Sequence, residues 1–108
     1  MPAYLSNYGA NHTLAAGVPV TVDIPIDGAR DWRFVLKNTG DTNDVTAGTV
    51  AYSPLGNLFT DAEAFPAGLP LAAGATTPVV GTGAPITTLR LTLTSTAGTT
   101  VHVEGGGW

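Results

Sequence analysis

The sequence contains one short polar stretch that could ligate a metal ion. Residues 41–44 read Asp-Thr-Asn-Asp, and oxygen-bearing side chains at alternate positions coordinate calcium in some loops. The calcium loop of helix–loop–helix proteins also needs Gly at its sixth position and Glu at its twelfth, where this chain has Thr46 and Tyr52. That loop is therefore excluded, and we interpret the stretch as a turn held by side-chain-to-backbone hydrogen bonds.

The histidines and serines show no catalytic spacing. His12 lies in an unpatterned N-terminal stretch, whereas His102 lies on the outward side of an expected strand. The chain has no cysteine, so no thiolate can bind zinc or act as a nucleophile. No serine is flanked by the glycines of a nucleophile elbow. We therefore predict no metal site, no cofactor and no catalytic residue.

Two carboxylates, Asp61 and Glu63, lie two residues apart in a long loop. Glycoside hydrolysis uses a carboxylate pair that flanks the sugar bond, so this chemistry is possible here in principle. A solvated pair in a polar loop is the more economical interpretation, and an enzyme ranks third among the functions that we consider.

The charge balance argues against two classes of partner. Four Lys and Arg residues against eight Asp and Glu residues give a net charge of −4, and the basic residues are scattered, so we expect no direct contact with nucleic acid. No apolar run approaches the length of a membrane span, and the N-terminus lacks the basic and apolar parts of a secretory signal. We expect a complete product made in the cytoplasm, without membrane contact.

The elements that must position any site are strands. Eight prolines and fourteen glycines in 108 residues interrupt every run that could become a helix, which predicts a single all-β domain. In residues 32–38, Trp32, Phe34 and Leu36 alternate with polar or smaller residues and lead into an Asn-Thr-Gly turn. This alternation predicts a strand with one buried face, around which the core is built.

Other segments show the same alternation of apolar and polar residues, but less clearly. Residues 18–26 place Val or Ile at every even position, and Pro19 and Pro25 predict that this strand lies at a sheet edge. Residues 45–53 and 76–80 predict two further strands. Residues 86–95 and 99–104 predict a hairpin that turns at residues 95–98.

Three segments lack a strand pattern. Residues 1–13 are predicted to form an N-terminal arm, which either frays or contacts a partner through its tyrosines. Residues 54–70 form a long loop with apolar side chains that look exposed, and such loops are commonly functional. Residues 105–108, Gly-Gly-Gly-Trp, are predicted to be a flexible tail whose Trp108 either caps its own domain or inserts into a neighbour. The β-sandwich domain then covers residues 14–104.

Residues 34–41, Phe-Val-Leu-Lys-Asn-Thr-Gly-Asp, are followed downstream by Leu-Ala-Ala-Gly at 71–74 and a threonine-rich strand. This arrangement resembles the immunoglobulin-like modules of bacterial surface proteins, notably the cell-adhesion-related domain found in bacteria. The resemblance covers roughly residues 32–104, and the long 54–70 loop departs from it. It implies an immunoglobulin-like antiparallel β-sandwich of about seven strands, here with extended N- and C-terminal arms.

The leucine-rich strand and residues 94–101, Thr-Ser-Thr-Ala-Gly-Thr-Thr-Val, also resemble the small structural proteins of tailed-phage virions. That resemblance implies a non-enzymatic capsid decoration or cement subunit. It would be located in the virion and bind the major capsid protein and copies of itself, as a trimer or another homo-oligomer. Interfaces draw on aromatic side chains, so the predicted interface residues are Tyr4, Leu5, Tyr8, Phe59, Phe65 and Trp108.

The alternative is a carbohydrate-binding or receptor-binding module. Trp32, Tyr52 or an aromatic residue of the long loop would then stack on sugar rings. Trp32 alternates in phase with Phe34 and Leu36, so we favour a core position for it.

Overall fold

The computed structural model describes residues 6–55, 58–60, 63–64, 69–82 and 87–108, which form eight strands and no helix. The strands are β1 (Ser6–Leu14), β2 (Val20–Pro25), β3 (Asp31–Asn38), β4 (Ala47–Ser53), β5 (Glu63–Ala64), β6 (Thr76–Thr82), β7 (Thr88–Thr94) and β8 (Thr99–Gly107). Seven of them have six residues or more, and β5 has two. The prediction of an all-β fold of about seven strands is confirmed.

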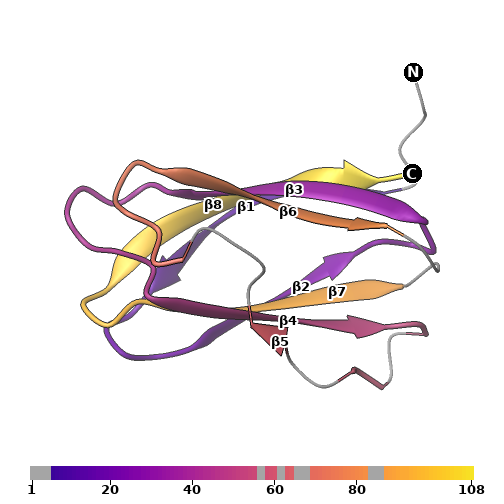
Figure 1. The fold of residues 1–108 in the computed structure, drawn as a ribbon, viewed down its shortest axis with the longest axis horizontal. Helices are drawn as coiled ribbons and strands as arrows, with labels where there is room; N and C mark the ends of the chain where they lie inside the picture. The colour runs from indigo at the N-terminus through magenta and orange to yellow at the C-terminus, as the bar shows by residue number, and fades with distance from the viewer. Residues whose placement is uncertain (1–5, 56–57, 61–62, 65–68, 83–86) are drawn as a thin grey trace.

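The strands form two four-stranded antiparallel sheets packed face to face (Figure 1). One sheet has the order β1-β8-β3-β6 and the other has the order β2-β7-β4-β5. In the first sheet β1 pairs with β8 and β3 with β6, and in the second sheet β2 pairs with β7 and β4 with β5. This is the pairing of one long hairpin rolled into a sandwich, the jelly-roll arrangement.

The jelly-roll order differs from the strand order of immunoglobulin domains, whose sheets are ABED and CFG. The β-sandwich is therefore confirmed, but its immunoglobulin-like order is not. The resemblance over residues 32–104 rests on turn residues, and similar turns occur in sandwiches with different strand orders.

The core lies between the sheets and is built as the alternation predicted. Phe34, Leu36 and Leu91 are fully buried, and Trp32 is only 6% exposed. Residues between them on β3 point outward, as its alternating burial shows. Strand β2 is an edge strand, which confirms the prediction from its prolines. A proline nitrogen cannot donate a hydrogen bond to a neighbouring strand, so prolines favour sheet edges.

The prediction of an N-terminal arm over residues 1–13 is wrong for its described part. Residues 6–14 form β1, which pairs along its whole length with β8. Tyr8, His12 and Leu14 occupy its inner side with small or polar residues between them, so the alternation is weak in hydrophobicity although it is regular in space. Residues 1–5 lie outside the described residues.

The prediction of a flexible tail over residues 105–108 is also wrong. Residues 105–107 are the last part of β8, between β1 and β3, and Trp108 continues the pairing with Asp31. Gly105 lies opposite Tyr8 and Phe34, with φ +157°. A Cβ added there would overlap the Arg33 carbonyl oxygen and the Phe34 Cα, so glycine is required by close approach and not by flexibility.

The predicted hairpin between residues 86–95 and 99–104 does not form. β7 and β8 belong to different sheets, and residues 95–98 carry the chain from one sheet to the other. Ser95 Oγ donates to Asp44 O at 2.6 Å and accepts from Gly98 N at 3.1 Å, while Gly98 takes φ +89°. The alternation identified both strands correctly, but it does not say which strands pair.

Asn38 joins the loops at this same end of the sandwich. Its fully buried side chain donates to Asn43 O and Leu71 O, at 2.8 and 3.0 Å. Its Oδ1 accepts from Gly40 N and Thr99 Oγ1, at 3.0 and 2.8 Å. The Asn-Thr-Gly turn thus holds three other segments, and a buried amide with every partner present is a stabilising arrangement.

Candidate interaction surface

The most exposed large apolar side chains of the described chain lie in the loop that follows β4. Leu55 is 81% exposed and Leu58 is 82% exposed. Single apolar side chains on a surface are ordinary, but two nearly free leucines in one short loop leave apolar area that a partner could remove from water.

Hydrogen bonds on both sides hold this loop against the sheet. Thr87 Oγ1 donates to Pro54 O at 2.6 Å, just before Leu55. Beyond Leu58, Thr60 N donates to Tyr52 O at 2.8 Å and Tyr52 N donates to Thr60 Oγ1 at 3.0 Å. Fixed flanks lower the ordering cost of binding, because less freedom remains to be lost.

Phe59 lies between these flanks and is held on the outer face of the β2-β7-β4 sheet. The Arg90 guanidinium carbon lies 3.8 Å from the centre of the Phe59 ring, a cation–π contact. Arg90 also donates to both carboxylate oxygens of Asp23, at 2.7 and 3.0 Å. Ala51 belongs to the same outer face and is only 6% exposed, which is consistent with cover by the loop.

The ion pair changes both acidities. Hydrogen bonding from Arg90 holds the pKa of the Asp23 carboxyl below its ordinary value of 3.8, and the same bond raises the pKa of Arg90. Asp23 keeps 47% and Arg90 keeps 37% of its side chain exposed, so solvent screens the pair. Its evident role is to place the guanidinium over Phe59.

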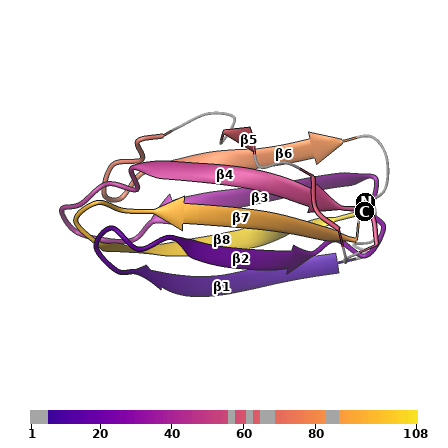
Figure 2. The same cartoon turned by 90° about the horizontal axis from the view of Figure 1, so that it is seen from below.

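Tyr8 lies on the inner side of β1 and packs against the core. Its hydroxyl is 2.8 Å from His12 Nε2, and the two rings are stacked with an interplanar angle of 5°. Partial burial raises the pKa of the Tyr8 hydroxyl. The pair lies on β1, which with β2 forms the edge strands on one side of the sandwich (Figure 2).

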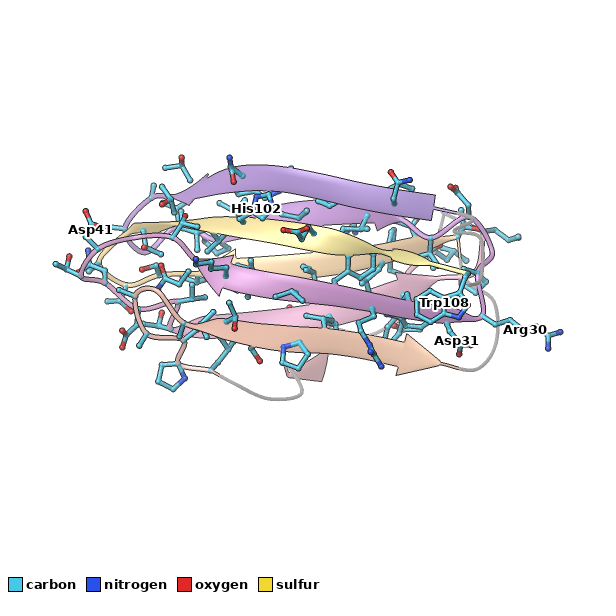
Figure 3. All side chains as sticks on the ribbon, turned by 90° about the horizontal axis from the view of Figure 1, so that it is seen from above. Arg30, Asp31, Asp41, His102 and Trp108 are labelled. Atoms are coloured by element: carbon cyan, nitrogen blue, oxygen red, sulfur yellow. The ribbon has the colours of Figure 1, made fainter. Side chains whose placement is uncertain are left out.

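Trp108 lies beside Asp31 at the end of the sandwich opposite Asp41 (Figure 3). Its backbone N donates to Asp31 O at 2.9 Å, and its carbonyl accepts from Arg30 N and Asp31 N at 3.2 and 3.3 Å. The indole is half-buried. The tail is therefore fixed on its own sheet by the backbone, and insertion of Trp108 into a neighbour remains a prediction.

Three of the six predicted interface residues can be placed. Tyr8, Phe59 and Trp108 come from different segments near one end of the sandwich, but they do not share a surface. Tyr8 is on the inner side of β1, Phe59 is on the outer face of the β2-β7-β4 sheet, and Trp108 is at the end of β8 in the other sheet. Tyr4, Leu5 and Phe65 lie outside the described residues.

The sequence pattern indicated a functional loop at residues 54–70 but did not single out Leu55. The signal was its position between Pro54 and Gly56, which removes it from any strand alternation and leaves it no predicted core contact.

Other candidate chemistry is not assembled in the described part of the chain. Asn11 lies opposite His102 and His12 lies opposite buried Val101, so the two histidines point to opposite faces of their sheet. No group of three or more potential metal-ligating side chains occurs among the described residues. Trp32 packs on Tyr52 with ring centroids 5.8 Å apart, so each of these two candidate sugar platforms has the other ring against it. No helix in the described ranges has the length and hydrophobicity to cross a membrane.

No family model matches the sequence, and no curated protein matches it. The structure is similar to the pre-peptidase C-terminal domain of a collagenase from Bacillus anthracis, with a TM-score of 0.58 and 10% identity over 93% of this chain and 89% of that one. It is also similar to chitosan-binding module 1 of a chitosanase/glucanase from Paenibacillus sp. IK-5, with a TM-score of 0.57 and 14% identity over 90% and 76% of the two chains. The mitogen of Yersinia pseudotuberculosis gives a TM-score of 0.57 and 9% identity over 95% and 86%. At such identities the likeness shows a β-sandwich and leaves function open.

Proposed function

We propose that this chain is a non-enzymatic structural protein of a phage virion, a decoration or cement subunit that binds the major capsid protein. The observation that carries the proposal is the pair of leucines, Leu55 and Leu58, 81% and 82% exposed on a loop fixed at both flanks. A structural subunit needs a preorganised adhesive surface and no reaction centre.

The energetics support adhesion through this loop. Burying one leucine side chain contributes about 1.5–3 kcal/mol, and about 1.4 kcal/mol changes affinity tenfold. Phe59 and Arg90 beside the leucines are the residue types found at the centres of interfaces. The net charge of −4 suits a basic or neutral protein surface better than nucleic acid.

Jelly rolls serve both as viral capsid domains and as lectins, so sugar binding is the competing proposal. Chitosan binding is the named property of one structural neighbour. Against it, the rings of Trp32 and Tyr52 contact each other and one face of Phe59 carries Arg90. Binding of the purified chain to chitosan or to a glycan array, lost on Phe59→Ala, would reverse this ranking.

The test uses phage particles banded from cultures that carry the gene. We expect the chain in fixed proportion to the major capsid protein, and we expect purified chain to rebind particles depleted of it. The Leu55→Ser/Leu58→Ser variant should rebind about tenfold or more weakly, because its loop no longer buries apolar area.

Val18→Ser is the matched control. Val18 is 52% exposed in the β1–β2 connection at the opposite end of the sandwich, so its loss should leave rebinding unchanged. Absence of the chain from the particles, or equal rebinding of all three proteins, would contradict the proposal.

A further inference from the structure

Three of the four sheet edges carry features that discourage pairing with another chain. β2 has Asp23 and Pro25, β6 has Pro78, and β5 has only two residues. Charges, prolines and short strands are the usual protections of an exposed edge. β1 is the fourth edge, and it is nine residues long without a proline or a charged side chain, SNYGANHTL.

Backbone hydrogen bonds within the sheet fix which groups of β1 face outward. Asp31 and Trp108 exchange two hydrogen bonds, so the even-numbered residues of β8 bond to β3 and the odd-numbered ones bond to β1. Opposite those odd residues of β8 lie the even residues of β1. The N–H and C=O groups of Asn7, Gly9, Asn11 and Thr13 therefore point to the free side of the sheet.

Prolines remove outward-facing backbone donors from two of the other edges. Asn38 N donates to Ala75 O, which places the nitrogen of Pro78 on the free side of β6. Ile26 N donates to Thr87 O, which places the nitrogen of Pro25 on the free side of β2. Both edges lack a donor where a partner strand would need one. β1 keeps every outward-facing backbone N–H donor. Among the described residues no strand lies beyond it, and it runs along the rim of the molecule (Figure 2).

We propose that β1 pairs antiparallel with β1 of a second copy, centred on Ala10, so that two β1-β8-β3-β6 sheets become one continuous sheet. In this register Gly9 lies opposite the partner's Asn11 and Asn7 opposite the partner's Thr13, so all four outward residues of each strand form hydrogen-bonded pairs. Registers centred one residue away on either side leave outward groups unpaired.

The side chains favour a second copy as the occupant. Each chain carries a net charge of −4, yet β1 has no charge, so two copies meet at this edge without like charges on the paired strands. On the inner side Tyr8 lies opposite the partner's His12, which extends the stacked Tyr8–His12 pair across the two-fold axis. The pairing predicts a dimer with two-fold symmetry, where the sequence led us to expect a trimer or another homo-oligomer. It does not depend on what the assembly binds.

Sedimentation velocity of the full chain tests the pairing through its mass. We expect twice the 10.9 kDa of one chain as concentration rises. Gly9→Pro removes a central outward donor without touching the bonds to β8, and should give the single-chain mass. Gly9→Ala is the matched control: it keeps the donor and finds only Glu104 Cβ at 3.9 Å, so it should remain a dimer.

Cross-linking gives a second readout that does not require Gly9→Pro to fold. The chain has no cysteine, and Ala10 would face the partner's Ala10 in a non-hydrogen-bonded pair with Cα atoms about 4.5 Å apart, within disulfide reach. Ala10→Cys should therefore form a disulfide dimer on mild oxidation, whereas Thr13→Cys should not. A single-chain mass at every concentration, a Gly9→Pro dimer, or equal cross-linking of the two cysteine variants would overturn the proposal.

Discussion

Gly105 shows that the structural role of a glycine can be predicted wrongly from the sequence. In sequence, three glycines before a terminal tryptophan predict a flexible tether. In the folded chain Gly105 lies in an inner strand of a sheet, where Phe34 and Tyr8 flank it and no Cβ can fit. Backbone freedom and lack of volume are both properties of glycine, and only the neighbouring strands decide which one is used.

Gly105→Ala should destabilise the protein by about 3 kcal/mol or more, because the added Cβ would separate β8 from β3. In a domain of this size that corresponds to a melting temperature lower by about 12 °C or more. Thermal unfolding followed by circular dichroism measures the difference.

Gly9→Ala serves as the control for that measurement. Gly9 faces Glu104 across β1 and β8, and an added Cβ would make only an ordinary contact with Glu104 Cβ at 3.9 Å, so its substitution should change stability by about 0.5 kcal/mol or less. Equal loss in both variants would mean that close approach at Gly105 is not the cause.

Asn38 illustrates what the sequence could and could not predict at this scale. The turn at 38–40 was predicted from its residue types. The buried amide was not, because its partners Asn43, Leu71 and Thr99 come from segments whose proximity depends on the strand order.

At the scale of elements, alternation predicted most strands and one edge, but not the pairing. Period-two patterns depend only on which face of a strand is buried, and both β7 and β8 bury one face against the same core. A connection of four residues fits a hairpin within one sheet and also an arch between two sheets. The deciding contacts, from Ser95 to Asp44 and Gly98, involve a third segment.

The Asp23–Arg90–Phe59 cluster gives the element-scale prediction. Because the pKa of Asp23 is lowered in the folded state, its contribution to stability is present above pH 3.8 and is lost as pH falls through the folded-state pKa. The melting temperature of the wild type should exceed that of Asp23→Asn at pH 6, and the two should converge in stronger acid.

Asp41→Asn controls for the loss of one negative charge, since Asp41 is exposed in the connection between β3 and β4, whereas Asp23 lies on β2 and pairs with Arg90. If it shows the same convergence as Asp23→Asn, the effect belongs to net charge and the ion pair contributes nothing of its own.

At the scale of the whole molecule, the strand order could not be predicted from the sequence. Pairing of β1 with β8 depends on the sum of many contacts across the chain, and no local pattern records it. The candidate surface could be predicted only in part. The sequence indicated the long loop, but the exposure of Leu55 could be recognised only from the positions of its neighbours in the fold.

Folding speed follows from this topology. Because the first and last strands pair, the chain must close a loop of nearly its whole length, and we expect refolding in milliseconds to seconds, as in other all-β domains. Stopped-flow fluorescence measures it, with Trp108→Phe leaving buried Trp32 as the reporter. Refolding within microseconds would be inconsistent with β1–β8 pairing in the rate-limiting step.

The central position of β8 also affects the nascent chain. β1 leaves the ribosome before the other described strands, whereas β8, its neighbour in the sheet, leaves after them. At about 5–20 residues per second, β1 waits for about 5–20 s with both of its sides unpaired. During that interval neighbouring chains on one polysome present the same uncharged strand to each other, so a chaperone that shields residues 6–14 should raise the yield of folded protein more than one acting on any later strand.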